Sequence, residues 1–335
     1  MRRMGVFGVL PLALTVLTVA ACGNGEAASG DGDVLRSAVG STRVNPLIAL
    51  HEAGQPQFGL YAPSPGGGRG RGDQPPPPVK APEERASEML SYTLSDYVFD
   101  GSMERGVDEA LPTFAAFKDA MQAQGADAHS HPMIVKAAKI ESAEQVARDV
   151  AKQLDAGVSG IMFVEVETAE EARMGLAAMR YAAHGGTRPD GSVGSAPAYW
   201  GVSADEYEKK ADLWPLNPDG ELISWVIVES LVGLENVREI AAVPGIGVLW
   251  PGAGTLRGIF STTDAEGRRV VDQEAWEAAI QTVLSACREF DVPCGFPANA
   301  EDIAMRMEQG FEVFVMGWGE QGFATVEMGR ERAGR

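Results

Sequence analysis

Apolar, strand-like segments alternate with helix-like segments along most of this chain, and this alternation constrains its fold more than any other feature. The strand-like segments cover residues 57–61, 96–100, 132–136, 160–165, 225–229, 247–250, 294–297 and 311–316. Repeated strand–helix units with continuous apolar strands are typical of a parallel sheet whose two faces are both buried. About eight such units favour an α/β fold of the (β/α)8 TIM-barrel class over an open doubly wound sheet.

The length and charge of the chain narrow its class further. The 335 residues, 45% of them hydrophobic, can fill one large barrel or two ordinary domains, which excludes wholesale disorder. The net charge of −19 argues against nucleic acid as a partner, because affinity for phosphates depends mainly on Lys and Arg. We therefore expect a folded α/β protein that binds no nucleic acid.

The first residues have the features of an export signal. Arg2 and Arg3 precede an apolar stretch, residues 6–19, which is too short to span a bilayer stably. The stretch leads into Val-Ala-Ala-Cys22-Gly, and small residues before a cysteine resemble a bacterial lipobox, in which the cysteine is lipidated and becomes the mature N-terminus. We expect residues 1–21 to be a lipoprotein signal peptide and Cys22 to be the lipidation site. An ordinary secretory signal or an uncleaved anchor is the alternative.

This signal predicts an exported, membrane-anchored lipoprotein on the periplasmic or cell-surface side, which meets the membrane through its N-terminal lipid only. Residues 22–43, rich in Gly and acidic side chains near their start, are expected to form a flexible tether. Residues 44–330 then form the barrel, with a Gly/Pro-rich loop over 63–85 directly after the first strand. In α/β barrels the loops after the strands line the catalytic face, and a surface insertion is the alternative for this loop.

Three stretches carry patterns more specific than the alternation itself. Residues 157–183 hold an apolar strand, then Glu-Thr-Ala-Glu-Glu-Ala-Arg, and a helix that ends in Arg-Tyr. Residues 225–229 form an apolar strand that ends in a glutamate, and residues 235–248 form a helix and a turn before another strand. Together these stretches resemble the HpcH/HpaI aldolase–citrate lyase family, and the similarity covers roughly residues 44–325.

That resemblance implies a phosphoenolpyruvate/pyruvate-type (β/α)8 barrel that cleaves or forms a carbon–carbon bond next to a 2-oxo acid, as a lyase of the aldehyde-lyase type. It also implies a divalent metal, Mg²⁺ or Mn²⁺, a small 2-oxo acid or hydroxy acid as the substrate, and a homo-oligomer. Such an ion polarises the substrate carbonyl and stabilises the enolate left when the bond breaks. Carboxylates at the C-terminal mouth of the barrel are the ligands expected to hold it.

Only one of the four catalytic groups that the resemblance implies stands unchanged. Glu229 ends a strand at the position of the family's first metal ligand. The aspartate of the family's G-P-A-D-L motif is replaced by Gly254 or Thr255, according to the register. Met103 stands where the family's D-G-E-H motif has its histidine. Lys136 stands in place of an arginine, which keeps the positive charge but loses the bidentate fork.

Other strand-end residues can stand in for the missing groups. Glu165 ends the fourth strand beside the expected position of Glu229, so these two carboxylates are predicted to share the metal; a loop carboxylate is the alternative. Lys136 and Asp100, at the ends of the third and second strands, are the predicted catalytic residues, with a strand-capping role as the alternative for Asp100. No cofactor besides the metal is predicted, because no GxGxxG or P-loop motif follows a strand.

The altered site leaves two interpretations of the function open. In the first, the chain is an exported carbon–carbon lyase with remodelled metal and base positions. In the second, it is a catalytically degenerate barrel that acts as a ligand-binding or interaction lipoprotein. Cys287 and Cys294, seven residues apart, leave a similar choice between a disulfide in an exported protein and two buried thiols.

Overall fold

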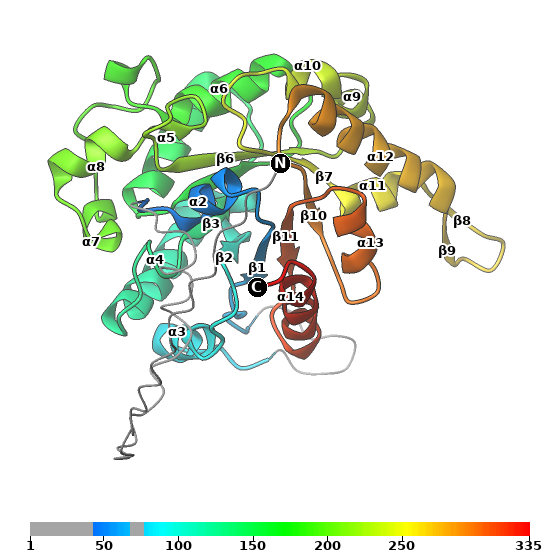
Figure 1. Ribbon diagram of the computed structural model, residues 1–335, viewed down its shortest axis with the longest axis horizontal. Coiled ribbons are helices and arrows are strands. Elements are labelled where there is room, and N and C mark those ends of the chain that lie inside the picture. The colour runs from blue at the N-terminus through cyan, green and yellow to red at the C-terminus, as the bar shows by residue number, and fades with distance from the viewer. Residues whose placement is uncertain (1–42, 68–76) are drawn as a thin grey trace, which may run out of the picture. The chain divides into compact units, whose positions relative to one another are not determined.

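Parallel strands and helices alternate along residues 43–67 and 77–335, the part of the chain that the computed structural model describes (Figure 1). The strands of the main sheet are β1 (Gln57–Tyr61), β2 (Val98–Asp100), β3 (Met133–Lys136), β4 (Gly160–Phe163), β5 (Leu213–Trp214), β6 (Leu222–Val228), β7 (Val248–Pro251), β10 (Gly295–Pro297) and β11 (Val313–Met316). The described residues fall in one compact unit. The expected signal peptide, Cys22 and the tether up to residue 42 lie outside them.

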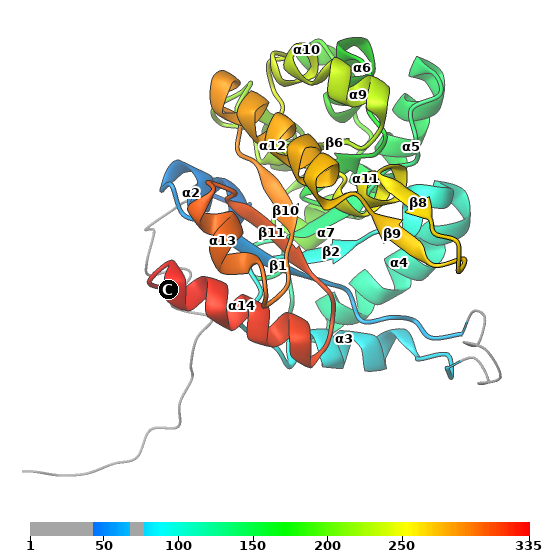
Figure 2. The ribbon, with the colours of Figure 1, turned by 90° about the vertical axis from the view of Figure 1, so that its right-hand side faces the viewer.

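Helices alternate with the strands, and most of them cover the outer face of the sheet. They are α2 (Pro46–Glu52), α3 (Pro82–Leu90), α4 (Val107–Ala123), α5 (Ala143–Asp155), α6 (Ala169–Met179), α7 (Ala196–Trp200), α8 (Ala204–Lys210), α9 (Leu231–Glu235), α10 (Val237–Ala241), α11 (Ala253–Ile259), α12 (Gln273–Phe290), α13 (Ile303–Glu308) and α14 (Glu320–Arg332). Figure 2 shows α12, α13 and α14 in front of β10 and β11. Among the residues described, no helix is both long enough and apolar enough to cross a membrane.

The main sheet is parallel throughout and curls. Its order is β10-β11-β1-β2-β3-β4-β6, and both β5 and β7 pair with β6. The curl brings β7 next to β10: Leu249 forms a parallel bridge with Cys294, and its N–H donates to the carbonyl of Pro293 at 2.9 Å. The expected α/β class and its curled parallel sheet are therefore present, and the short strand β5 is an addition that the sequence pattern did not predict.

Two hydrophobic cores lie on the two faces of the sheet. The larger one fills the space between the strands and the outer helices. The smaller one lies inside the curl, where Trp225 is surrounded by the rings of Tyr97, Phe99 and Trp250 at centroid distances of 5.3, 6.1 and 5.2 Å. Leu47 and Leu50 of α2 join this inner core. Because this aromatic core is closely packed inside the curl, the strands that surround it are held in fixed positions relative to one another.

Local sequence signals explain several element ends. Asn45 caps α2, whose first residue is Pro46, and the side chain of Ser142 caps α5. Thr168 and Glu171 form a capping box at the start of α6, since each side chain binds the other residue's backbone N–H. This capping box fixes where α6 begins.

The structure differs from the expected elements in three places. In place of the single helix expected within residues 235–248, the chain forms two short helices, α9 and α10, which meet at Asn236. The loop expected over 63–85 is shorter, because α3 begins at Pro82 and uses this proline in its first turn. An antiparallel hairpin, β8 (Ser261–Thr263) and β9 (Arg269–Val271), lies between α11 and α12 and was not expected.

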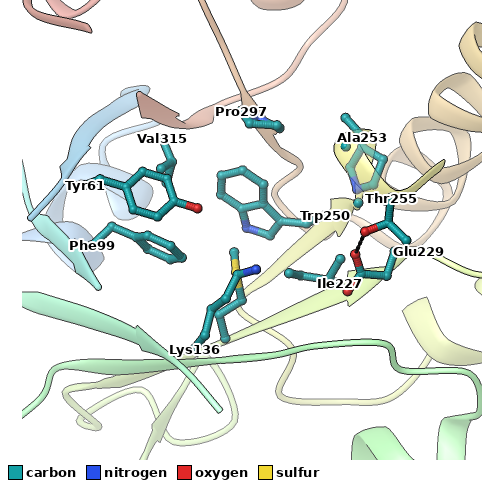
Figure 3. A pocket seen from close by; sticks show the side chains of 14 residues that line it. Tyr61, Phe99, Lys136, Ile227, Glu229, Trp250, Ala253, Thr255, Pro297 and Val315 are labelled. Atoms are coloured by element: carbon teal, nitrogen blue, oxygen red, sulfur yellow. Dashed lines mark hydrogen bonds between the residues drawn. The ribbon is translucent and has the colours of Figure 1, made fainter. Parts of the chain in front are cut away.

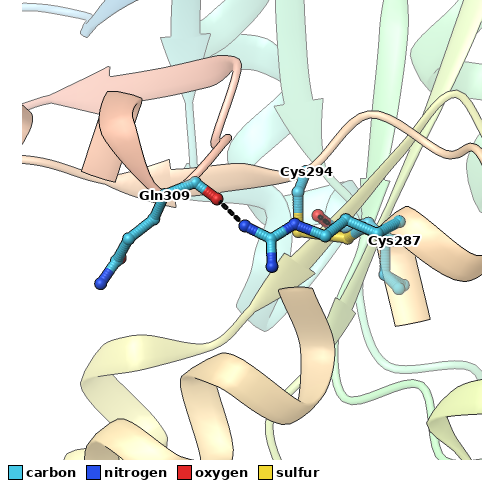
Figure 4. Close-up of a disulfide and its surroundings, with 5 residues drawn as sticks. Cys287, Cys294 and Gln309 are labelled. Atoms are coloured by element: carbon cyan, nitrogen blue, oxygen red, sulfur yellow. Dashed lines mark hydrogen bonds between the residues drawn. A yellow bond between two sulfur atoms is a disulfide. The ribbon is translucent and has the colours of Figure 1, made fainter. Parts of the chain in front are cut away.

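Cys287 and Cys294 form a disulfide, which decides between the two states left open by the sequence (Figure 4). Cys287 lies near the end of α12, and Cys294 directly precedes β10 and bridges to β7. Both cysteines are almost fully buried. The disulfide therefore ties α12 to the place where the two ends of the curled sheet meet.

Candidate active site

A cavity of about 240 Å³ lies at the carboxyl ends of the strands (Figure 3). Tyr61, Lys136 and Pro297 are the last residues of β1, β3 and β10, and Glu229 directly follows β6. The cavity is lined by Tyr61, Phe99, Lys136, Met162, Ile227, Glu229, Trp250, Pro251, Gly252, Ala253, Gly254, Thr255, Pro297 and Val315. The carboxyl ends of parallel strands are where α/β barrels place their active sites.

Glu229 is held in this cavity by two hydrogen bonds. The hydroxyl of Thr255 donates to Oε2 at 2.6 Å, and the backbone N–H of Glu165 donates to Oε1 at 3.1 Å. The residue is only 7% exposed. Gly252 packs so closely that a Cβ there would lie 2.1 Å from the Cβ of Glu229, so a glycine is required at this position. The carboxylate is thus fixed in place with one hydrogen bond on each oxygen.

Lys136 brings a positive charge to the same cavity. Its side chain is 17% exposed, and Nζ donates to Oε2 of Glu104 at 3.0 Å. Glu104 lies in the short 3-10 helix η1 (Ser102–Arg105), directly after β2. Among the described residues that line the cavity, Lys136 is the one cationic side chain. Lys136 is the last residue of β3, at the strand end where the sequence analysis places it, and its predicted catalytic role stays a prediction.

Aromatic and aliphatic side chains form the remaining walls. Figure 3 shows Tyr61 and Phe99 on one side of the cavity and Glu229 and Thr255 on the other. Tyr61 and Phe99 meet edge to face, with centroids 4.8 Å apart. Burial, together with the negative charges of Glu104 and Asp100, raises the pKa of Tyr61 to about 12. Its hydroxyl therefore keeps its proton at neutral pH and can donate a hydrogen bond.

Asp100 lies in an adjoining cavity of about 510 Å³, which Tyr61 and Phe99 also line. Its Oδ1 accepts a hydrogen bond from the backbone N–H of Ser102 at 2.8 Å, and its Oδ2 lies 3.9 Å from Nη2 of Arg85. Arg85 is 3% exposed, and this burial lowers the pKa of its guanidinium. Asp100 thus caps the turn at the end of β2 and forms an ion pair with Arg85 beside the site. Its predicted catalytic role stays a prediction.

Glu165 contacts Glu229 through its backbone and not through its carboxylate. Its Oε2 accepts a hydrogen bond from Nζ of Lys139 at 2.8 Å, and this ion pair is exposed. The backbone of Glu165 has a φ of 49°, a left-handed conformation that is strained for a residue with a side chain. In this conformation the backbone N–H of Glu165 points to Glu229, so the strained residue supplies one of the two hydrogen bonds that hold the Glu229 carboxylate.

The donors at the site do not fit the expected two-carboxylate metal centre. Glu229 is the one carboxylate among the described residues that line the cavity, and the ammonium of Lys136 lines it too. Within the described residues, no three His, Cys, Asp or Glu side chains are grouped so that they could hold a metal ion. Mg²⁺ and Mn²⁺ prefer several oxygen ligands, so this donor set supplies too few of them.

Met103 occupies the position where the resemblance implies a histidine, and Thr255 is one of the two residues, with Gly254, that stand where it implies an aspartate. Thr255 faces the cavity and binds Glu229, which makes it a hydrogen-bond donor instead of a metal ligand. Met103 is fully buried, with Sδ 3.7 Å from Nε2 of Gln153, and does not line the cavity. Sequence reasoning missed Glu104 and Tyr61; Glu104 directly follows Met103, and its charge one residue after the altered position was the available signal.

Comparison with known proteins matches most of this sequence to one protein family. A family model for HpcH/HpaI aldolase/citrate lyase matches residues 95–320. A hydroxypyruvate/pyruvate aldolase from Cupriavidus necator is 28% identical over 170 residues, which cover 47% of this chain and 60% of that protein. One from Delftia acidovorans is 33% identical over 158 residues, which cover 47% of this chain and 53% of that protein. The matched part of this chain thus spans little more than half the length of these curated relatives.

The fold has counterparts among solved structures. A crystal structure of an HpcH/HpaI aldolase/citrate lyase family protein from Burkholderia cenocepacia matches with a TM-score of 0.58 and 21% identity, over 83% of this chain and 93% of that one. At this identity the match shows the fold alone. With the family model, which matches more than half of the sequence, it leads to one conclusion: this chain belongs to the HpcH/HpaI aldolase/citrate lyase family, whose curated relatives are aldolases, that is, carbon–carbon lyases.

Proposed function

We propose that this protein is a carbon–carbon lyase that cleaves or forms a bond next to the carbonyl of a small 2-oxo acid or hydroxy acid. Its family and the names of its relatives, which are aldolases of hydroxypyruvate and pyruvate, support this proposal. A cavity of about 240 Å³ is small, which suits a substrate of a few carbon atoms. The substrate class is therefore a short oxo acid.

The observation that carries this proposal is that Lys136, Tyr61 and Glu229 line one cavity at the carboxyl ends of the strands. The ammonium of Lys136 attracts the carboxylate or the carbonyl oxygen of an oxo acid. The protonated hydroxyl of Tyr61 can donate to a substrate oxygen on which negative charge develops. Glu229 keeps free lone pairs that can accept the proton of a substrate hydroxyl. These are the roles that an aldol cleavage needs.

A coupled assay tests the proposed activity. The purified full-length protein is given aldol adducts of pyruvate and hydroxypyruvate, and pyruvate release is followed with lactate dehydrogenase. We expect turnover that Glu229→Gln lowers by about 100-fold or more, because the variant loses the acceptor. Glu170→Gln, at an exposed glutamate on α6, is the matched control and should keep full activity. Absence of turnover across all adducts would contradict the proposal.

The metal expectation has a separate test, because the donor set argues against it. Mg²⁺ and Mn²⁺ are titrated into the protein in a calorimeter, with Glu229→Gln and Glu165→Gln as variants. We expect no saturable binding at the site. Saturable binding that both variants remove would restore the predicted ion shared by Glu229 and Glu165.

A second candidate function rests on the two altered positions. The buried Met103 stands where the resemblance implies a base, and Gly254 or Thr255 stands where it implies a metal ligand, which favours a barrel that binds an organic acid without turning it over. Saturable calorimetric binding of pyruvate, without turnover of any adduct, would support this ligand-binding lipoprotein and not the lyase.

We also propose that the protein is exported and held at the membrane by a lipid on Cys22. The disulfide between Cys287 and Cys294 supports export, since disulfides persist mainly in oxidising compartments. Cys22→Ser is expected to move the protein from the membrane fraction to the soluble fraction. An unchanged distribution of this variant would contradict the lipid anchor.

Two finer structural features belong to the same proposal. We propose a closed (β/α)8 barrel, which the bridge between Leu249 and Cys294 supports. We also propose a homo-oligomer, as the family resemblance implies. The exposed apolar side chains of Leu231 and Val232 on α9 support a contact between copies next to the strand that leads to Glu229.

A further inference from the structure

Aldol cleavage needs a group that accepts the electron pair of the broken bond, and the described residues point to an amine for this task. This inference rests on the proposed lyase function and names its electron acceptor. A metal ion beside a carbonyl oxygen is one such acceptor, but the cavity offers one carboxylate where a shared ion needs more. An imine formed between a lysine and the substrate carbonyl is the other common acceptor.

Lys136 has the surroundings that an imine-forming lysine needs. It ends β3, and its backbone carbonyl accepts a hydrogen bond from Nε2 of Gln153 at 2.9 Å, which fixes the base of the side chain. Phe99, Met162 and Trp250 line the cavity around it, so the walls near the lysine side chain are largely apolar. Figure 3 shows the side chain of Lys136 directed into the cavity, toward Phe99 and Trp250. An apolar pocket with little water favours condensation of an amine with a carbonyl and protects the product from hydrolysis.

Glu104 lies where a proton carrier for this reaction must lie. Its Oε2 is 3.0 Å from Nζ of Lys136, within reach for direct proton transfer. The carboxylate is 39% exposed at the mouth of the site, so it can also exchange protons with water. Tyr61 lines both the cavity that contains Lys136 and the adjoining cavity that contains Glu104. Its protonated hydroxyl can donate a hydrogen bond to the carbonyl oxygen of the substrate.

We propose that Nζ of Lys136 forms a Schiff base with the carbonyl carbon of the 2-oxo acid. Nζ passes one proton to Glu104 and attacks the carbonyl carbon, so that a C–N bond forms. A second proton moves from nitrogen to the former carbonyl oxygen. Glu104 returns the first proton to this oxygen, which leaves as water, and the product is a protonated imine. The sum is one ammonium and one carbonyl giving one iminium and one water.

The imine then accepts the electrons of the cleaved bond. Glu229 takes the proton of the substrate's aldol hydroxyl, the carbon–carbon bond breaks, and its electron pair forms an enamine as the iminium becomes neutral; an aldehyde leaves. Glu229 returns its proton to the enamine carbon, and water hydrolyses the imine to release the oxo acid and restore the ammonium of Lys136. No metal and no external oxidant or reductant takes part.

Reductive trapping tests the proposal. The full-length protein is incubated with pyruvate and sodium borohydride, which reduces an imine to a stable secondary amine, and digested peptides are examined by mass spectrometry. We expect one adduct, on Lys136. Lys136→Arg should remove it, and Lys139→Arg, at an exposed lysine that pairs with Glu165, should keep it. No adduct, or adducts spread over exposed lysines, would overturn the proposal.

Two further measurements separate this inference from the lyase function itself. Glu104→Gln should slow trapping by about 100-fold, since it removes the proton carrier while Lys136 stays in place. Turnover should persist in the presence of EDTA. Turnover without any adduct, abolished by EDTA, would overturn the Schiff base and leave the lyase standing. An adduct on Lys136 without turnover would support the Schiff base while contradicting the lyase.

Discussion

Thr255 and Glu229 form the tightest side-chain contact at the site. Their hydrogen bond is 2.6 Å long and joins a neutral hydroxyl to a buried carboxylate. A hydrogen bond to a charged group contributes more than a neutral one, and a buried acceptor that loses its partner is costly. Thr255 therefore holds the carboxylate of Glu229 in place, a structural role that the sequence pattern did not indicate.

Replacement of Thr255 tests this role. Thr255→Val keeps the shape but removes the donor, so we expect the free energy of unfolding to fall by about 1–3 kcal/mol. Thr255→Ser keeps the hydroxyl and should lose much less. Urea unfolding of both variants measures the difference. Equal losses in the two variants would show that the hydrogen bond contributes nothing.

His51 provides a pH test at the same scale. Its ring stacks on Trp214 at 5.3 Å, its Nε2 is buried without a hydrogen-bond partner among the described residues, and burial lowers the pKa of this histidine to about 3. Between pH 6.5 and 3 the unfolded chain therefore binds a proton that the folded chain does not bind. The stability is complete above pH 6.5 and is lost as the pH falls.

The expected loss from His51 is about 2 kcal/mol between pH 7.5 and pH 5. His51→Phe keeps the aromatic stack and removes the titrating group, so its unfolding free energy should fall less over this range. Urea unfolding at the two pH values measures both proteins. An identical pH dependence in the wild type and in His51→Phe would contradict the assignment.

The sequence predicted some site residues and not others, for physical reasons. Lys136 and Glu229 were found because each follows a short apolar run, and such runs in a parallel sheet end at a common edge. Glu165 is at that edge too, but its left-handed backbone turns the side chain to Lys139, and a conformation of this kind has no sequence signature. Glu104 was missed because η1, which directs it toward Lys136, is too short to predict.

At the scale of elements, the disulfide holds α12 where β7 meets β10. It closes a short loop, and a cross-link of this kind is expected to stabilise the fold by roughly 2 kcal/mol. In a Cys22→Ser background, a reductant should therefore lower the midpoint of urea unfolding, and Cys287→Ala with Cys294→Ala should remove this response. A midpoint that the reductant does not change would contradict the assigned stabilisation.

Element ends were predictable where a cap or a proline marks them. Pro46 at the start of α2, Thr168 and Glu171 at the start of α6, and the amphipathic pattern of residues 273–290 are signals of this kind in the sequence. The break between α9 and α10 at Asn236 had no such signal; the side chain of Asn236 donates there to the carbonyl of Glu167 in another loop. Tertiary contacts of this kind override local helix propensity.

At the scale of the whole molecule, strand–helix alternation was sufficient to predict an α/β fold with a parallel sheet, and the closed (β/α)8 barrel that it favoured stays a prediction. The inner aromatic core around Trp225 explains why the sheet curls around a filled interior and why the cavity lies at one end of it. The net charge of −19 gave no information about the position or the chemistry of the site. The absence of nucleic-acid binding stays a prediction from composition.

The central claim is that this cavity is the site of a carbon–carbon lyase whose cationic group is Lys136. The most direct test is the rate of pyruvate release from a cleaved aldol by Lys136→Met and by its matched control, Lys139→Met, beside the wild type. The account predicts that Lys136→Met loses about 100-fold or more in kcat/KM, since it removes the charge at the reacting carbonyl, while Lys139→Met stays at the wild-type rate. Equal rates in Lys136→Met and the wild type would contradict it.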